Sequence, residues 1–329
     1  MATGYVKSEL VTVFGGSGFL GRHVVRALAR RGYRVRAAVR RPDLAGHLQP
    51  LGAVGQIHAV QANIPNRASI DRAVAGADIV INLVGILYQS GRQSFDAVQG
   101  FGPGAVAAAA KTAGVSRFVH VSAIGADADS DSDYARSKAE GEAAVVKAFP
   151  EAVILRPSIV FGPEDDFFNR FAAMARMAPV LPLIGGGETR FQPVFVGDVA
   201  EAVARAAEGK AKPGTIYELG GPEVRTFRQL LEYILAETGR SRLLAPLPFG
   251  LARLKAHFLQ LLPKPLLTVD QVRQLAHDNV VSEAAVSEHR TIEDLGIEPQ
   301  AIETVVPTYL SRYRRAGQFS APNRTASET

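Results

Sequence analysis

The sequence predicts an α/β protein, a doubly wound parallel sheet with a smaller mixed C-terminal lobe, and three observations support this prediction. Short apolar runs alternate with helical patterns six times over roughly 160 residues. A glycine-rich turn follows the first apolar run. The run at 79–84 is apolar, as expected of a central strand that helices cover on both faces.

The expected elements of the first half follow from hydrophobic periodicity. Strands are expected at 9–14, 33–39, 57–62, 79–84, 117–121 and 153–161. Helices are expected at 19–31, 42–51, 68–74, 95–113 and 134–149. The second half is less regular, with a strand–helix pair at 194–208, a strand at 215–219, a helix at 227–238 and proline-interrupted helical segments up to 315.

These elements suggest three parts. Residues 1–165 form the sheet domain, to which 194–208 return; residues 166–317 form the smaller lobe; and 318–329 form a flexible, polar tail.

Composition excludes several classes of site. The chain of 329 residues has 47% hydrophobic and 21% charged residues, the balance of a soluble globular protein. It has no cysteine, so disulfides, thiolate metal sites and cysteine nucleophiles are excluded. The seven histidines are scattered without metal-ligand spacing, so no metal site is expected.

Charge and terminal sequence bear on partners and location. A net charge of +5 is compatible with nucleic acid, an anionic membrane surface, a phosphate-bearing ligand or an acidic partner. The basic residues are spread out and not interleaved with aromatics, so no nucleic-acid partner is expected. The first strand begins by Glu9 or Leu10, which leaves no room for a signal peptide, and no apolar run approaches the roughly 20 residues that span a bilayer. A cytoplasmic protein is expected.

Gly15, Gly18 and Gly21 lie between the first strand and the first helix with a three-residue spacing. In a dinucleotide-binding turn the first glycine permits the tight turn, the second lets the backbone approach a pyrophosphate, and the third lets the helix pack on the strand. The helix N-terminus adds amide groups and a partial positive charge. The strand–turn–helix context favours a Rossmann-type site over a merely structural turn.

The end of the second strand distinguishes the two dinucleotides. NAD sites usually place Asp or Glu there for the ribose 2′-hydroxyl, whereas this strand ends in Arg40 and Arg41. A guanidinium can grip a 2′-phosphate in bidentate fashion, so NADP(H) is the expected cofactor, with Ser17 as a further donor. Two solvated arginines before Pro42 are the alternative.

Tyr134 and Lys138 are four residues apart and share one helix face. A phenol titrates near pH 10, and an adjacent ammonium lowers its pKa and can also hold the nicotinamide ribose. Ser122, just after the fifth strand, could polarise a substrate carbonyl. The pair is common by chance and gains meaning from the glycine turn before it.

With these motifs the chain resembles the extended and atypical short-chain dehydrogenase/reductases. The resemblance also rests on 82–85, 121–123, 155–157, 161–163 and 194–200. It implies a catalytic trio of Ser122, Tyr134 and Lys138. It implies cofactor contacts from Gly15, Ser17, Gly18, Phe19, Leu20, Gly21, Arg40, Arg41, Asn63, Ile64, Leu83, Val84, Gly85, Tyr134, Lys138 and Pro157. Asn63 departs from the Asp usual at its position, but its carbonyl can still accept the adenine amino group.

The segments 266–272, 278–282, 294–297 and 309–314, with 5–21, resemble one branch of this group, the NADPH-binding accessory subunits of respiratory complex I and their α-proteobacterial relatives. That resemblance implies complex I subunits as partners, a tightly held NADPH with a structural role, and a peripheral position on the cytoplasmic face of the inner membrane. The alternative is an active NADP-dependent reductase, epimerase or dehydratase on a small or nucleotide-linked substrate. Gly185–Gly187 and Arg190 would then help line the substrate pocket, or form an ordinary loop. An NADPH-sensing regulator is a third hypothesis.

Residues 249–262 form an amphipathic, mildly basic helix between Pro248 and Pro263. The pattern favours a helix whose apolar face lies in the core. A helix on a membrane surface or against a partner is the alternative.

Overall fold

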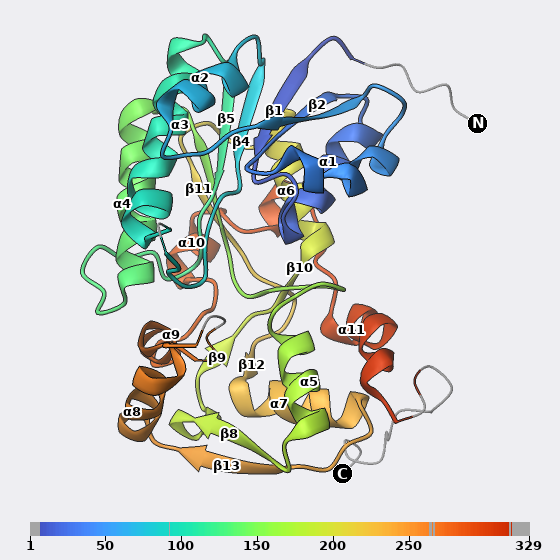
Figure 1. Ribbon diagram of the computed structural model, residues 1–329, viewed down its shortest axis with the longest axis vertical. Helices are drawn as coiled ribbons and strands as arrows, with labels where there is room; N and C mark the ends of the chain where they lie inside the picture. Colours follow the sequence, from blue (N-terminus) through green and yellow to red (C-terminus); the bar gives the residue numbers. More distant parts are fainter. Residues whose placement is uncertain (1–6, 92, 263–264, 266, 316, 318–329) are drawn as a thin grey trace. The chain divides into compact units, whose positions relative to one another are not determined.

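The computed structural model describes all residues except 1–6, 92, 263–264, 266, 316 and 318–329 (Figure 1). The chain divides into two compact units. The first contains the chain up to Pro157, Gly197–Leu219 and Glu283–Ile297; the second contains Ser158–Val196, Gly220–Ser282 and the chain from Glu298 onward. The expected flexible tail lies outside the described residues.

The first unit is built on a parallel sheet of seven strands in the order β11-β6-β5-β4-β1-β2-β3. This confirms the predicted doubly wound α/β fold. The strands are β1 (Leu10–Phe14), β2 (Arg34–Val39), β3 (Ile57–Gln61), β4 (Ile79–Asn82), β5 (Arg117–Val121), β6 (Val153–Pro157) and β11 (Ile216–Leu219).

Helices cover both faces of this sheet, with α2, α3 and α4 on one side and α1 and α6 on the other (Figure 1). The helices of the unit are α1 (Phe19–Arg30), α2 (Arg67–Val74), α3 (Phe101–Thr112), α4 (Asp133–Ala148), α6 (Val196–Ala207, whose first residue belongs to the second unit) and α10 (Glu283–Ser287). A buried cluster that includes Val80, Val106, Phe118 and Phe149 fills the layer between the sheet and α2, α3 and α4.

Four elements differ from the sequence prediction. The segment 42–51 forms two 3-10 turns, Pro42–Leu44 and Gly46–Leu51, instead of one helix. Within the second turn, Pro50 cannot donate the amide hydrogen bond that an α-helix would need there. The helix predicted at 95–113 begins with a π-helical turn, Asp96–Gly100. The strand predicted at 153–161 is interrupted after Pro157, and Val160–Phe161 form β7 in the second unit.

The fourth difference concerns the strand at 215–219, which we expected in the smaller lobe. It is β11, which pairs with β6 and extends the main sheet. The first stretch of the first unit ends at Pro157 instead of residue 165, and the unit also takes in Gly197–Leu219 and Glu283–Ile297, whereas 194–196, part of the segment 194–208 expected to return, lie in the second unit.

The second unit contains three two-stranded pairs, β10–β7, β12–β9 and β13–β8, of which only the β12–β9 pair is antiparallel. Its other strands are β8 (Val180–Ile184), β9 (Arg190–Phe191), β10 (Val194–Phe195), β12 (Arg225–Thr226) and β13 (Leu243–Leu247). Its helices are α5 (Phe168–Met177), α7 (Phe227–Glu237), α8 (Phe249–Leu259), α9 (Val269–Gln274) and α11 (Ile302–Leu310).

Phenylalanine rings from β7, β9, α5 and α7 form the core of the second unit. No helix in the described part of the chain is long and apolar enough to cross a bilayer.

Candidate functional site

The strand order places a topological switch point at the carboxyl edge of the sheet. β1 lies between β2 and β4. From β1 the chain adds β2 and β3 on one side of the sheet, and then crosses to add β4, β5 and β6 on the other side. Ligands of open parallel sheets bind in the crevice outside the carboxyl ends of the strands at such a switch point. The residues that follow β1 to β5 all lie at this edge, because these strands are parallel.

The glycine turn fits closely between β1 and α1. Gly15 adopts a φ of +80°, which favours glycine, and a Cβ built on Gly21 would lie 2.2 Å from the Gly15 carbonyl oxygen. A side chain at position 21 would therefore push the turn out of shape. The Gly15 amide donates to the Ala38 carbonyl oxygen at 3.1 Å, which ties the turn to the end of β2.

The N-terminus of α1 suits a pyrophosphate. Gly18 is the N-cap and has no side chain to cap the helix, and the first turn holds no acidic residue. The first amides of a helix have no intrahelical acceptor, and the helix dipole favours an anion there. A Cβ on Gly18 would approach only the Gly15 carbonyl oxygen, at 3.3 Å. The cradle therefore fits the phosphates of a dinucleotide.

The two arginines at the end of β2 differ in their contacts. The Arg41 guanidinium donates to the Asp43 carboxylate at 3.0 and 2.8 Å, and this contact raises the pKa of Arg41. Arg40 is exposed and forms no ion pair with any residue that the structure describes. Of the two, Arg40 is the one whose charge is available to a 2′-phosphate.

Asn63 and Ile64 follow β3 at the same edge. The Ser69 hydroxyl accepts from the Asn63 amide and donates to its carbonyl oxygen, both at 2.9 Å, so the backbone is held and the exposed side chain stays available. Ile64 is buried, and its side chain would collide with a Cβ on Gly102 of α3. Ile64 therefore shapes the fold at this edge.

Lys138 lies beneath the loop that follows β4. It is buried on α4, its Nζ lies 5.8 Å from the centre of the Tyr134 ring, and a Cβ on Gly85 would lie 3.3 Å from the same Nζ. Burial lowers the pKa of Lys138 to about 8, and the nearby Glu142 carboxylate opposes part of that shift. No described residue accepts a hydrogen bond from this ammonium, so it is suited to hold a ribose hydroxyl.

The Tyr134 ring packs edge-on against Phe95, with 5.8 Å between the ring centres. This contact fixes the ring, and the N-cap of α4, Ser132, accepts from the Ala135 amide beside it. The structure thus brings Tyr134, Lys138 and Gly85 together, as the helical spacing predicts for the first two.

Ser122 is buried just after β5, where its amide donates to the Leu155 carbonyl oxygen at 2.8 Å. Its Oγ has no hydrogen-bond partner among the described residues. A buried hydroxyl is usually satisfied, so this one is available to a ligand. Pro157 ends the neighbouring β6, and its carbonyl oxygen accepts from the Ile124 amide at 3.0 Å.

Two polar residues of this edge were missed from the sequence. Gln99, in the π-helical turn, accepts from the Ile86 amide at 2.8 Å and donates to the Ser137 hydroxyl at 3.3 Å. It therefore links the loop after β4 to α4. His120 is buried 3.3 Å from Asn82, and burial lowers its pKa to about 3, so it is neutral. A polar residue inside β5 is the sequence signal that could have pointed to His120, whereas no local signal points to Gln99.

The second unit uses its glycines for packing. Gly185 has a φ of +63°, and a Cβ there would lie 2.3 Å from the Phe249 ring. The Arg190 guanidinium pairs with the Asp278 carboxylate at 2.7 Å. These contacts support the reading of Gly185–Gly187 as an ordinary loop.

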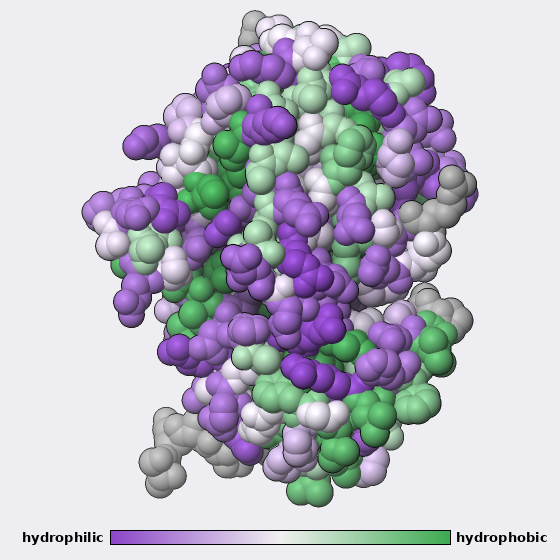
Figure 2. Space-filling view, turned by 90° about the vertical axis from the view of Figure 1, so that its left-hand side faces the viewer, coloured by the Kyte–Doolittle hydropathy of each residue, from purple (hydrophilic) through white to green (hydrophobic). Residues whose placement is uncertain are grey.

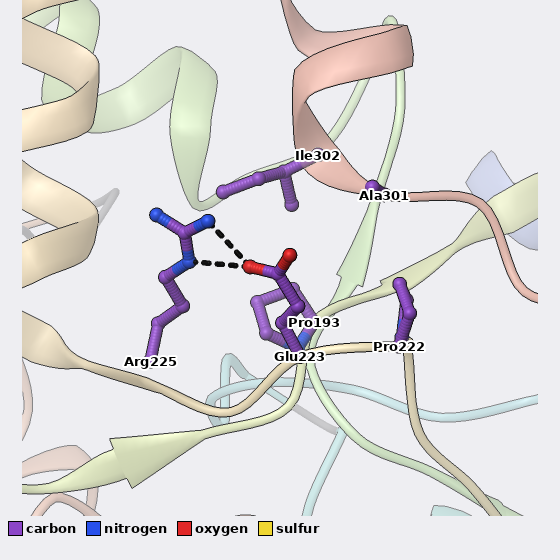
Figure 3. A pocket seen from close by; sticks show the side chains of 6 residues that line it. All are labelled: Pro193, Pro222, Glu223, Arg225, Ala301 and Ile302. Atoms are coloured by element: carbon purple, nitrogen blue, oxygen red, sulfur yellow. Dashed lines mark hydrogen bonds and ion pairs between the residues drawn. The ribbon is translucent and has the colours of Figure 1, made fainter. Parts of the chain in front are cut away.

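A shallow pocket in the second unit is lined by Pro193, Pro222, Glu223, Arg225, Ala301 and Ile302 (Figure 3). The Arg225 guanidinium points at the Glu223 carboxylate and also reaches Glu303 at 2.8 Å. Its charge is already neutralised, so this pocket offers little to an anionic ligand. No group of His, Asp and Glu in the described part of the chain has the arrangement of a metal site.

The strand order and the glycine turn at its switch point define a Rossmann-type, NAD(P)-binding fold. The chain belongs to the NAD dependent epimerase/dehydratase family, whose model matches residues 11–220. It is 35% identical over 324 residues to NADH dehydrogenase [ubiquinone] 1 alpha subcomplex subunit 9 of Arabidopsis thaliana, covering 95% of this chain and 80% of that protein.

Two further similarities extend the comparison. A ceramide reductase of Caulobacter vibrioides is 36% identical over 191 residues, or 58% of either chain. The fold is similar to that of an NADPH-dependent quinone oxidoreductase from Escherichia coli solved with NADPH, at a TM-score of 0.72 and 20% identity, covering 91% of this chain and 99% of the other.

Proposed function

We propose that this chain is an NADP(H)-binding accessory or assembly subunit of respiratory complex I, in which NADPH stabilises the fold. The observation that carries the proposal is the extent of the similarity to a mitochondrial complex I subunit. It runs over 95% of the chain, beyond residue 220 where the family model ends. A shared Rossmann domain alone would not produce a match through the second unit.

Each part of the cofactor has a complementary group in the first unit. The amides at the start of α1 would hold the pyrophosphate, Arg40 the 2′-phosphate, and Lys138 the nicotinamide ribose. Bound NADPH would supply a hydride to a carbonyl or another acceptor. The buried ammonium of Lys138 would gain hydrogen-bond acceptors that none of the described residues provides. Binding of this kind stabilises a fold whether or not the hydride is ever transferred.

An active reductase is the second candidate, and the intact trio favours it. Burial keeps the pKa of Lys138 near 8, so the residue is still mostly charged at neutral pH and can lower the pKa of the Tyr134 phenol. Tyr134 would then deliver a proton to the substrate oxygen while Ser122 orients that oxygen. The similarity to a ceramide reductase supports this candidate over the shared 58% of the chain.

The accessory-subunit proposal and the reductase candidate differ in the role of Tyr134, because only the reductase needs its phenol for turnover. Under the accessory-subunit proposal, the chain comigrates with complex I subunits when native membranes are solubilised gently, as a peripheral protein of the cytoplasmic face. The Tyr134→Phe variant then keeps this comigration and its bound NADPH. Migration apart from every complex I subunit would contradict the proposal. NADPH-dependent turnover that Tyr134→Phe abolishes would establish the reductase instead.

A further inference from the structure

Helix α8 exposes its large apolar side chains. Leu251, Leu254 and Phe258 are 54%, 58% and 69% exposed, and Leu261 and Leu262 continue the same face after the helix ends. We call these five residues the α8 face. Figure 2 looks onto the side on which α8 lies, and hydrophobic side chains gather at the lower end of that view. This corrects the expectation that the large apolar residues of 249–262 lie in the core.

The residues on the opposite side of α8 explain why its large apolar side chains face outward. Ala252 and Ala256 are fully buried, and they pack with Ile184 of β8 and Val272 of α9. The Phe249 ring fits over Gly185, which has no side chain to obstruct it. Small residues thus let α8 approach its neighbours closely, and the 3.6-residue periodicity then directs the larger leucines and Phe258 outward.

The stretch of sequence that contains α8 carries charge of one sign. Residues 239–269 contain no Asp or Glu, and they contain Arg240, Arg242, Arg253, Lys255 and Lys264. These five account for the whole net charge of +5, because the other 32 Lys and Arg residues equal the 32 Asp and Glu residues in number. The four of them that the structure describes form no ion pair with another described residue.

Lys255 and Arg253 border the α8 face on opposite sides, as the helical periodicity requires. Both are exposed, and with His257 they form the polar margin of the helix. An apolar face bordered by basic side chains is the pattern of a helix that lies in the plane of a membrane surface. Anionic headgroups attract such side chains, while their alkyl stems can lie along the apolar boundary.

We propose that the α8 face docks the protein on an anionic phospholipid surface, with Leu254 and Phe258 entering the acyl boundary and Arg253 and Lys255 meeting acidic headgroups. A protein partner is less favoured, because a protein surface complementary to this region must supply acidic groups around an apolar patch, whereas an anionic bilayer presents both everywhere. The proposal deepens the peripheral membrane position in the proposed function, and it rests on that position.

Sedimentation with vesicles tests the proposal on the purified full chain. We expect binding to phosphatidylcholine vesicles that contain phosphatidylglycerol, and weaker binding to phosphatidylcholine alone. Arg253→Gln with Lys255→Gln should lower the partition coefficient on the mixed vesicles by about 25-fold, since each basic residue near an anionic surface strengthens binding about fivefold. Leu254→Glu and Phe258→Glu should each lower it at least tenfold, because each removes a buried apolar side chain.

Val54→Glu is the matched control, because Val54 is also an exposed apolar residue but lies in the first unit. It should leave binding unchanged, and circular dichroism checks that every variant is folded. Equal binding to both kinds of vesicle, binding to neither, or an equal loss in Val54→Glu would overturn the proposal. No vesicle binding together with loss of complex I comigration in Phe258→Glu would assign the α8 face to a protein partner.

The vesicle assay contains neither nucleotide nor complex I subunits. If vesicle binding fails, NADPH retention and comigration with complex I still test the proposed function. If NADPH retention or comigration fails, the vesicle result still tests the docking proposal. The two proposals can therefore fail independently.

Discussion

Arg40 is the residue on which the distinction between the two dinucleotides depends. We expect Arg40→Ala to weaken NADPH binding about tenfold to a hundredfold, because a hydrogen bond to a charged group contributes about 1.5–3 kcal/mol. NADH binding should change little, since NADH has no 2′-phosphate. Fluorescence titration with both nucleotides measures the difference.

Arg41 provides the control for that titration. Its guanidinium is engaged by Asp43, so Arg41→Ala should affect NADPH less than Arg40→Ala does. Equal losses of NADPH and NADH in Arg40→Ala would contradict the assignment of the 2′-phosphate to Arg40.

The buried charge of Lys138 in the candidate cofactor site lowers the folding stability of the protein. Burial depresses its pKa from 10.5 to about 8, so below about pH 8, where both states are protonated, the buried charge costs about 3 kcal/mol of folding free energy. Between about pH 8 and 10.5 the unfolded state binds more protons than the folded state, so the cost diminishes as pH rises. Lys138→Met should therefore unfold less readily than the wild type near neutral pH without nucleotide.

Urea unfolding of both proteins across this pH range checks the prediction. The stability difference should shrink towards zero as the pH approaches 10.5, while Lys138→Met binds NADPH more weakly throughout. A difference that does not change with pH would show that the lysine is not buried as a charge.

At the scale of elements, an ion pair holds α4 on β6. The Arg156 guanidinium donates to the Glu142 carboxylate at 2.9 and 2.6 Å, and Glu142 is buried. Glu142→Gln should destabilise the protein by up to roughly 3 kcal/mol, because it leaves the largely buried Arg156 guanidinium with the more distant Glu218 carboxylate, at 3.8 Å, as its ion-pair partner. Denaturant unfolding measures this change.

Asp71→Asn is the comparison for that variant, because the Arg67–Asp71 pair is exposed and contributes at most about 1 kcal/mol. Since α4 also carries Lys138, Glu142→Gln should weaken NADPH binding as well. A loss no greater than that of Asp71→Asn would mean that the pair does not hold α4.

Elements that depend on residues close together in the sequence could be predicted, whereas elements that depend on contacts between distant segments could not. The β1–turn–α1 unit could be predicted because its glycines, apolar run and helix are contiguous. β11 could not be placed, since its pairing of Tyr217 with Leu155 depends on a strand far away in the sequence. Periodicity showed that 249–262 is amphipathic, but it could not show that Ala252 and Ala256 would be the buried side.

In the candidate site, too, the features set by neighbouring residues could be predicted and those set by distant segments could not. The helical spacing of Tyr134 and Lys138 is local and was predicted, whereas the burial of Lys138 depends on the β4 loop closing over α4. The pairing of Arg41 with Asp43, two residues along the chain, is local and could have been predicted from the sequence. Gln99 could not be assigned, because its partners Ile86 and Ser137 come from different elements.

At the scale of the whole molecule, a bound nucleotide would be part of the folded structure. At a free concentration 100 times its dissociation constant, NADPH would stabilise the chain by about 2.7 kcal/mol. The expected consequence is a protein that keeps its nucleotide through purification.

The central claim is that the glycine turn and Arg40 hold NADP(H). Its most direct test is to purify the protein natively, dialyse it, denature it, and identify the released nucleotide by mass spectrometry. We expect close to one NADP(H) per chain after dialysis, and much less from Arg40→Ala. Release of NAD(H) instead, or of no nucleotide from a folded protein that also fails to bind added NADPH, would contradict it.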